Sequence, residues 1–220
     1  MAWLVVWMSG TAGWSAEAPL WQRAMSDLTK SPHYWACAVA STMTVYDGDN
    51  QRLGAVESRR ELELQAGRPV WKETSRKRTG EPGMVITMDL GLQQDSRDVL
   101  KDYTEWVLLR TDVVEQVAVE VWQGKLVAEP GNVVVANLEP GTARPRRLQF
   151  TFPYHSMLGT MQVSVDVDYA VGPDGAWLPR RATVDQSGRF LFRKRRIQIE
   201  NNYEDWRRAD PAAPAPVKAS

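Results

Sequence analysis

Cysteine is nearly absent from this sequence. Cys37 is the only one among 220 residues, so the chain cannot form a disulfide within itself. It sits in the apolar stretch 34–40, where a cysteine is typical of a small buried hydrophobic side chain. A nucleophilic thiol needs a nearby base, and the chain has only two histidines. We therefore expect no thiol catalysis here.

An excess of one charge is also lacking. Lys plus Arg equals Asp plus Glu at 27 each, which gives a formal net charge of zero. Domains that bind nucleic acid are usually clearly basic, because they neutralise phosphates. The balance therefore predicts that nucleic acid is not a partner.

Side-chain sets for metal or acid–base chemistry are missing as well. His33 and His155 lie far apart, and neither has a cysteine or carboxylate at metal-ligand spacing. Asp166 and Asp168 alternate with valines, which places them on the polar face of a strand. No glycine-rich phosphate loop occurs. We expect a protein that is not an enzyme and needs no cofactor or metal.

No apolar run reaches the roughly 20 residues that span a bilayer. The N-terminus instead has a short apolar stretch at 2–8, small residues at 9–13 and an A-x-A pattern at 16–18. This order is typical of a secretory signal peptide over residues 1–18, although it lacks a basic n-region. A buried strand or an amphipathic anchor is the alternative. We expect export to the periplasm.

The rest of the chain begins with a helix and then changes to a period of two. Trp21, Met25 and Leu28 fall on one face of a short helix within residues 16–31. Strands are expected at 35–46, 52–65, 70–79 and 84–90, with two more over 103–127. A short second helix is expected at 93–103. The Pro/Ala-rich tail 209–220 is expected to be disordered or extended.

Alternation is clearest in the last third of the chain. The segments NVVVANL, RRLQFTF, MQVSVDVDYAV and RRATVD are strand-like and bounded by Gly or Pro. The sequence predicts one mainly β (α+β) domain over residues 19–208. We expect about ten antiparallel strands with an N-terminal helix and a short second helix as cover.

Apolar side chains on these alternating faces are candidates for a hydrophobic binding surface. A curved sheet with a loose helical cover is a natural site for an acyl chain, which needs no polar motif to bind. The candidate lining residues are Trp21, Met25, Val119, Val121, Phe150, Phe152, Val163, Val165, Val167 and Phe192. An ordinary filled core would show the same pattern.

Three C-terminal segments carry a family resemblance. They are RRLQFTF, then VSVDVDYAVGPDGAWLPRRATVD, then GRFLFRKRRIQIENNYEDWR. Their order resembles the outer-membrane lipoprotein-sorting (LolA-like) proteins, as a broad group rather than the lipoprotein carrier itself. The resemblance implies an unclosed antiparallel β half-barrel with a helical lid, whose concave face holds acyl chains or a hydrophobic partner.

The sequence thus favours a periplasmic, non-enzymatic protein that binds a lipid or another hydrophobic ligand, with a role in outer-membrane lipid or lipoprotein trafficking. The alternative is a protein-interaction or envelope-sensor module on the same fold without lipid cargo. An envelope protein partner and a peripheral membrane contact are compatible with both.

The basic run at 193–196 raises a separate question. Phe190 and Phe192 have even numbers and would share one face of an extended strand, whereas Ile197 and Ile199 have odd numbers and would share the opposite face. In a single closing strand this change of parity predicts a β-bulge within the basic run. Some of these cations would then line the edge of the sheet and discourage edge-to-edge pairing.

Overall fold

The computed structural model describes residues 19–30, 34–65, 68–81, 103–126, 129–156, 159–190, 193–208 and 217–218. The predicted signal segment and Phe192 lie outside these residues. So does most of the second predicted helix, of which only Tyr103 is described, as the first residue of a strand. The tail contributes one described piece, a two-residue strand.

The first described element is helix α1, Leu20–Lys30, as the sequence predicts. Leu20 and Ala24 are buried, and Trp21 and Met25 of the same face are partly buried against the core. Residues four apart in a helix lie one above the other, so these side chains form one apolar stripe. In the part of the chain that the structure describes, no helix is long and apolar enough to cross a membrane.

Among the described residues, thirteen strands and one 3₁₀ turn follow the helix, and most of them match the predicted segments. The strands are β1 Tyr34–Trp35, β2 Ala38–Tyr46, β3 Arg52–Gln65, β4 Arg68–Gly80, β5 Tyr103–Val114, β6 Val117–Leu126, β7 Glu129–Leu138, β8 Pro145–Ser156, β9 Gly159–Val171, β10 Trp177–Phe190, β11 Arg193–Glu204, β12 Arg207–Arg208 and β13 Val217–Lys218. The turn η2, Pro173–Gly175, joins β9 to β10.

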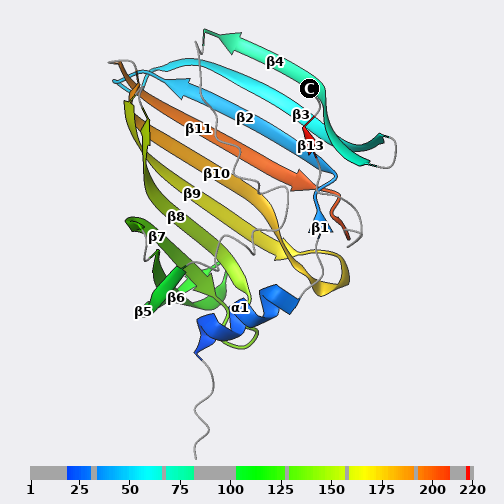
Figure 1. Cartoon of the computed structure of the whole chain (residues 1–220), viewed down its shortest axis with the longest axis vertical. Helices are drawn as coiled ribbons and strands as arrows, with labels where there is room; N and C mark the ends of the chain where they lie inside the picture. Colours follow the sequence, from blue (N-terminus) through cyan, green and yellow to red (C-terminus); the bar gives the residue numbers. More distant parts are fainter. Residues whose placement is uncertain are drawn as a thin grey trace, which may run out of the picture.

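Eleven of the strands form one sheet in the order β13-β4-β3-β2-β11-β10-β9-β8-β7-β6-β5. All neighbours are antiparallel except β13, which pairs with β4 in parallel. The end strands do not pair with each other, so the described sheet is unclosed. Figure 1 shows it as a long curved sheet with α1 lying at the end near β5, β6 and β7. The predicted mainly β, open antiparallel architecture with a helix is confirmed.

The main core lies on one face of this sheet, which we call the concave face. In β9 the residues Met161, Val163, Val165, Val167 and Tyr169 are buried, while the polar residues between them are more exposed. Neighbouring strands continue the same face by direct cross-strand pairing. Successive side chains of a strand point to opposite faces, so this alternation separates an apolar face from a polar one.

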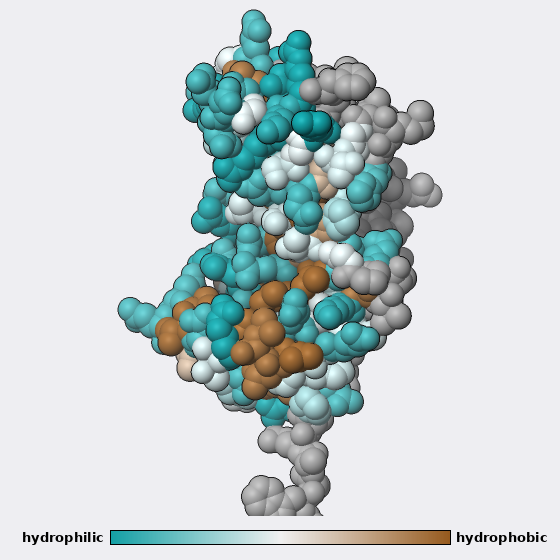
Figure 2. Space-filling model, turned by 90° about the vertical axis from the view of Figure 1, so that its left-hand side faces the viewer, coloured by the Kyte–Doolittle hydropathy of each residue, from teal (hydrophilic) through white to brown (hydrophobic). Residues whose placement is uncertain are grey.

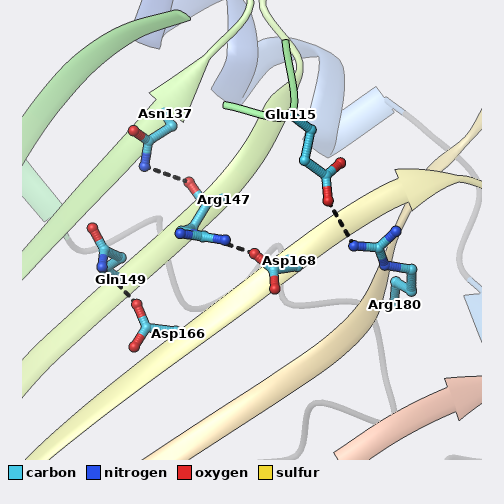
Figure 3. Close-up of polar contacts among 7 residues, drawn as sticks. All are labelled: Glu115, Asn137, Arg147, Gln149, Asp166, Asp168 and Arg180. Atoms are coloured by element: carbon cyan, nitrogen blue, oxygen red, sulfur yellow. Dashed lines mark hydrogen bonds and ion pairs between the residues drawn. The ribbon is translucent and has the colours of Figure 1, made fainter. Parts of the chain in front are cut away.

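Polar side chains of the opposite, outer face bind one another. Arg147 donates to Asp168 at 2.7 Å, and Gln149 donates to Asp166 at 2.6 Å. Figure 3 shows these pairs side by side on β8 and β9, with Asn137 of β7 reaching the backbone oxygen of Arg147. The expectation that Asp166 and Asp168 belong to a polar strand face is correct.

The predicted bulge in the basic run is wrong. Strand β10 ends at Phe190, β11 begins at Arg193, and these two residues pair, so the segment is a hairpin of two strands. Even-numbered residues of β10 and odd-numbered residues of β11 lie on the same face because the chain reverses between the two strands. The run does not lie at a sheet edge either, because β11 pairs with β10 on one side and β2 on the other. Arg196 binds Asp185 of β10 through two guanidinium nitrogens.

Candidate hydrophobic ligand site on the concave face

Three cross-strand rows make up the centre of the concave face. Because directly paired residues of adjacent strands share a face, the register defines each row. The rows are Leu148–Val167–Ala182, then Phe150–Val165–Val184–Ile199–Met43, then Phe152–Val163–Gln186–Ile197–Val45. All are apolar except Gln186. The concave face is therefore a continuous apolar surface from β8 to β2.

Gln186 is the exception, and its environment is unusual. Its side chain is only 2% exposed, and its direct neighbours in the row are Val163 and Ile197. Among the residues that the structure describes, no group accepts a hydrogen bond from its Nε2 atom. Buried polar atoms are almost always hydrogen-bonded, so an unsatisfied amide in an apolar surface calls for an explanation.

Helix α1 covers one end of this face through an aromatic stack. The rings of Trp21 in α1 and Trp106 in β5 are stacked, with centroids 5.8 Å apart and planes 12° apart. Trp106 donates its indole N–H to the backbone oxygen of Tyr103 at 3.1 Å. The ring also lies against Gly124 of β6, where a Cβ atom would be 2.9 Å from it. Glycine at 124 therefore makes room for the tryptophan that holds the helix.

The space beneath the helix is small. A cavity of about 10 Å³ lies between α1, Trp106 and the ends of β7 and β8, lined mainly by Ala136, Leu138 and Leu148. That volume is at the lower limit for one water molecule, whereas pockets for drug-sized ligands measure about 300 to 1,000 Å³. Where the described residues of α1 meet those of β7 and β8, the helix packs closely on the sheet, and this space is too small for an acyl chain.

Two titratable groups near the core have perturbed pKa values. Burial, followed by the charge of Glu129, raises the pKa of Tyr103 above its ordinary value. Burial also raises the pKa of the Cys37 thiol, and the charges of Arg207 and Asp205 act on it in opposite directions. A raised pKa leaves less nucleophilic thiolate at neutral pH. Within the described ranges, no three His, Cys, Asp or Glu side chains lie together as a metal site would need.

The predicted lining residues fall into three groups. Phe150, Val163, Val165 and Val167 are buried in the concave core, and Trp21, Met25 and Phe152 pack against it partly buried. Val119 and Val121 are fully buried, but the register places them on the opposite face, in line with Asn137 and Arg147. Phe192 is outside the described residues. As ligand contacts, all ten stay predictions.

The alternating valines of β6 were predicted to line the concave face. The register instead places Trp122 and Gly124 on the concave side of this strand. The turn between β5 and β6 reaches across to β10, where Arg180 donates to Glu115 at 2.9 Å (Figure 3). Sequence alternation alone does not tell which side of β6 faces the concave core.

Sequence reasoning also missed Trp106, Gly124 and Gln186. For Gln186 a signal exists, because Ala182 and Val184 share its parity in β10 and would have placed it inside. For Trp106 and Gly124 no local signal exists. Their contact joins two strands and a helix that are far apart in the sequence and come together only in the folded protein.

A second surface feature is the β5 apolar edge, formed by Val107, Leu108, Leu109 and Val113. Their exposed fractions are 57, 45, 45 and 64%. Figure 2 views the molecule from the side where β5 lies in Figure 1 and shows apolar side chains gathered on its lower half. Among the described strands, β5 pairs only with β6, so its other edge is open. Large apolar side chains on an open strand edge are unusual, because such edges invite pairing with other chains.

Together these features define a class of protein: an open, curved antiparallel sheet with an apolar concave face and a helix covering one end. No family model and no curated protein matches the chain. Solved structures are similar in fold.

One is a DUF1329 family protein from Desulfovibrio piger, with 11% identity, a TM-score of 0.43, and coverage of 88% of this chain and 93% of that chain. Another is a putative outer membrane lipoprotein-sorting protein domain from Vibrio parahaemolyticus, with 12% identity, a TM-score of 0.43, and coverage of 87 and 92%. A third is a LolA superfamily protein from Nitrosomonas europaea, with 13% identity, a TM-score of 0.39, and coverage of 87 and 92%. The last two names belong to the broad group that the sequence resembles. At these identities and TM-scores, they carry no conclusion about what this chain binds.

Proposed function

We propose that this protein is a non-enzymatic binding protein of the bacterial envelope that holds a lipid or another hydrophobic ligand on its concave face. The observation that supports it is the continuous apolar surface from β8 to β2 on an unclosed sheet. Each buried CH₂ group of an acyl chain contributes about 0.8 kcal/mol. An acyl chain along such a surface gains affinity without any polar motif.

In this proposal α1 is a lid. It is joined to the sheet end by the Trp21–Trp106 stack and by packing over β7 and β8. Because the space beneath it is about 10 Å³, the ligand enters when the helix moves away from the face. Binding then shifts the population from the closed arrangement to an open one. The apparent affinity is the affinity of the open form multiplied by the fraction of molecules that are open.

Export is part of the same proposal. Residues 1–18 act as a signal segment, the binding domain covers 19–208, and the ligand belongs to lipid or lipoprotein trafficking at the outer membrane. Fractionation of cells that express the full chain, followed by N-terminal sequencing of the mature protein, tests this. Recovery only in the cytoplasm with residues 1–18 intact would exclude it.

The binding proposal is tested on protein purified from the periplasm in the absence of detergent. Organic extraction and mass spectrometry should recover a co-purified lipid, and a fluorescent fatty acid should bind the delipidated protein in a saturable way. Absence of lipid together with absence of fatty-acid binding would refute the proposal.

A second function, a protein-interaction module without lipid cargo, is favoured by the β5 apolar edge. An open strand edge offers unpaired backbone groups as well as apolar side chains. A bilayer cannot satisfy those backbone groups, whereas a strand from a protein partner pairs with them. The close packing beneath α1 is also consistent with a filled core.

Lysine at two edge positions, Val107→Lys with Val113→Lys, should abolish capture of a partner by delipidated protein if this second function holds. The double variant should leave fatty-acid binding unchanged, because neither side chain belongs to the concave core. Capture of the same protein at the same stoichiometry by both forms would contradict the edge as the interface.

A further inference from the structure

We infer that Gln186 recognises the carbonyl oxygen of an acyl ligand, so that the concave face selects acyl compounds over plain hydrocarbons. This inference rests on the proposed binding function and adds the chemistry of the ligand to it. It starts from the Nε2 donor of Gln186, which has no acceptor among the described residues although the side chain is 2% exposed.

The register places the amide in the middle of the apolar surface. Val163 of β9 and Ile197 of β11 are its direct neighbours, and Phe152 and Val45 extend the same row outward. A methionine or leucine would fill this position without an unsatisfied donor. A glutamine there weakens the unliganded protein, and a ligand oxygen that accepts from Nε2 removes that penalty. The amide thus contributes to ligand selection rather than to folding.

The same face carries a cation one step further along β11. Arg195 is partly buried and pairs with Gly188, two residues beyond Gln186 in β10. It is a diagonal neighbour of Gln186, a relation that typically spans about 7–8 Å. Between these residues, one carboxylate oxygen of a fatty acid can accept from the amide while the other points to the guanidinium. In a lipid ester, the carbonyl can lie at the amide while a phosphate points to the guanidinium. Gly188 has no side chain to separate the two groups.

The shared chemistry is the acyl carbonyl, which occurs in free fatty acids and in lipid esters. The two sources differ at Arg195, because only the free acid offers a carboxylate to the guanidinium in a single-chain ligand. Palmitate and methyl palmitate therefore distinguish them. The fluorescent probe N-phenyl-1-naphthylamine lacks a carbonyl and reports the apolar surface alone.

The experiment compares wild type with Gln186→Met, which keeps the shape of the side chain without its polar atoms. The matched control is Gln162→Met, an exposed glutamine on the outer face of β9. We expect Gln186→Met to weaken palmitate and methyl palmitate about tenfold, the effect of one buried hydrogen bond. Binding of the naphthylamine probe should stay within twofold, and Gln162→Met should change neither.

Arg195→Gln should weaken palmitate at least fivefold and methyl palmitate less than twofold if the free acid is the ligand. If Arg195→Gln weakens palmitate and methyl palmitate equally and only slightly, the site is assigned to lipid esters, and the carbonyl contact with Gln186 is still supported. The midpoint of chemical denaturation of unliganded Gln186→Met should equal or exceed that of wild type, because a buried unsatisfied donor is removed.

Two results would overturn the inference while leaving the proposed function intact. One is unchanged palmitate and methyl palmitate binding in Gln186→Met with normal probe binding. The other is a large loss of stability in that variant, which would make the amide a structural group. If wild type binds neither acyl ligand nor probe, the proposed function itself fails.

Discussion

On the outer face of β8 to β11, polar side chains pair with one another, while the concave face of the same strands is mainly apolar. Arg147 reaches Asp168, and Arg196 reaches Asp185, across adjacent strands. On the concave face the single buried amide, Gln186, has no partner for its donor among the described residues. The outer-face side chains named here have partners within the sheet, whereas the Nε2 donor of Gln186 has no acceptor among the described residues.

This difference separates structure from function along the same strands. Exposed ion pairs contribute about 0 to 1 kcal/mol each, so the outer face specifies pairing partners more than it stabilises. Burial of apolar side chains on the concave face supplies most of the stability, at roughly 25 cal/mol per Å². Changes on the two faces should therefore differ in size, and the following experiments measure that difference.

The largest effect is expected for Gly188→Ala on the concave side of β10. A Cβ atom there would lie 2.2 Å from the backbone oxygen of Thr160 and 2.7 Å from Cα of Met161. Backbone atoms of β9 cannot move without breaking the pairing of the two strands, so we expect a loss of at least about 3 kcal/mol in the free energy of unfolding. Urea denaturation followed by circular dichroism measures it.

Gly141→Ala is the control for this change, because a Cβ atom there meets nothing within 4 Å. It should alter the unfolding free energy by less than about 0.5 kcal/mol. A similar loss for both glycines would show that backbone flexibility, and not the close approach of β9 and β10, sets the effect.

A matched exchange compares the two faces directly. Val163→Thr introduces a hydroxyl group into the fully buried concave core and should lower the free energy of unfolding by about 1–3 kcal/mol. Thr183→Val removes a hydroxyl group from the partly exposed outer face of β10 and should change it by less than about 0.5 kcal/mol. Thermal unfolding of both variants checks the contrast, and equal effects would contradict the assignment of the faces.

A smaller effect on stability, of about 1–2 kcal/mol, is expected for Gly124→Ala, because the added methyl group displaces a side chain and not the backbone. Trp106 must shift, and its stack with Trp21 loosens. Hydrogen exchange of α1 should become faster while that of β9 stays unchanged. In the control, Gly131→Ala, the Cβ atom would be at an ordinary 3.4 Å from Pro153, so exchange of α1 should match wild type.

The smallest effect is expected for the outer ion pair. A double-mutant cycle of Arg147→Met and Asp168→Asn should give a coupling energy below about 1 kcal/mol, since the arginine side chain is 39% exposed. Added salt should reduce the coupling further. A coupling above about 2 kcal/mol would show that the outer face also stabilises the sheet.

The helix and most strands could be predicted from the sequence, because the alternation of apolar and polar residues along a strand is a local pattern. The helix at Leu20–Lys30 and most strands appear where their periods predict them. The β10–β11 hairpin was missed for a local reason too, because no Gly, Pro, Asn or Asp marks the reversal between Phe190 and Arg193. An uninterrupted run of Phe, Leu and Arg residues, without a turn residue, predicts one continuous strand.

The candidate site was accessible only in part. Phe150 and Val165 lie on the concave face, in strands with clean alternation. Val119 lies on the opposite face, because the side of β6 that faces the core carries Trp122 and a glycine in place of aliphatic residues. Contact of any of these residues with a ligand stays a prediction. Which face of an edge strand turns inward depends on the curl of the whole sheet, and that is a long-range property.

The stacked pair of Trp21 and Trp106 also gives the molecule its own optical signal. Two indole rings with centroids 5.8 Å apart are close enough for their electronic transitions to couple, and we expect this coupling to give a paired positive and negative band in the ultraviolet circular dichroism spectrum. The band should vanish when α1 leaves the sheet. Opening of the proposed lid can therefore be followed in unlabelled protein, during a titration or a stopped-flow experiment, without a dye that competes for the concave face.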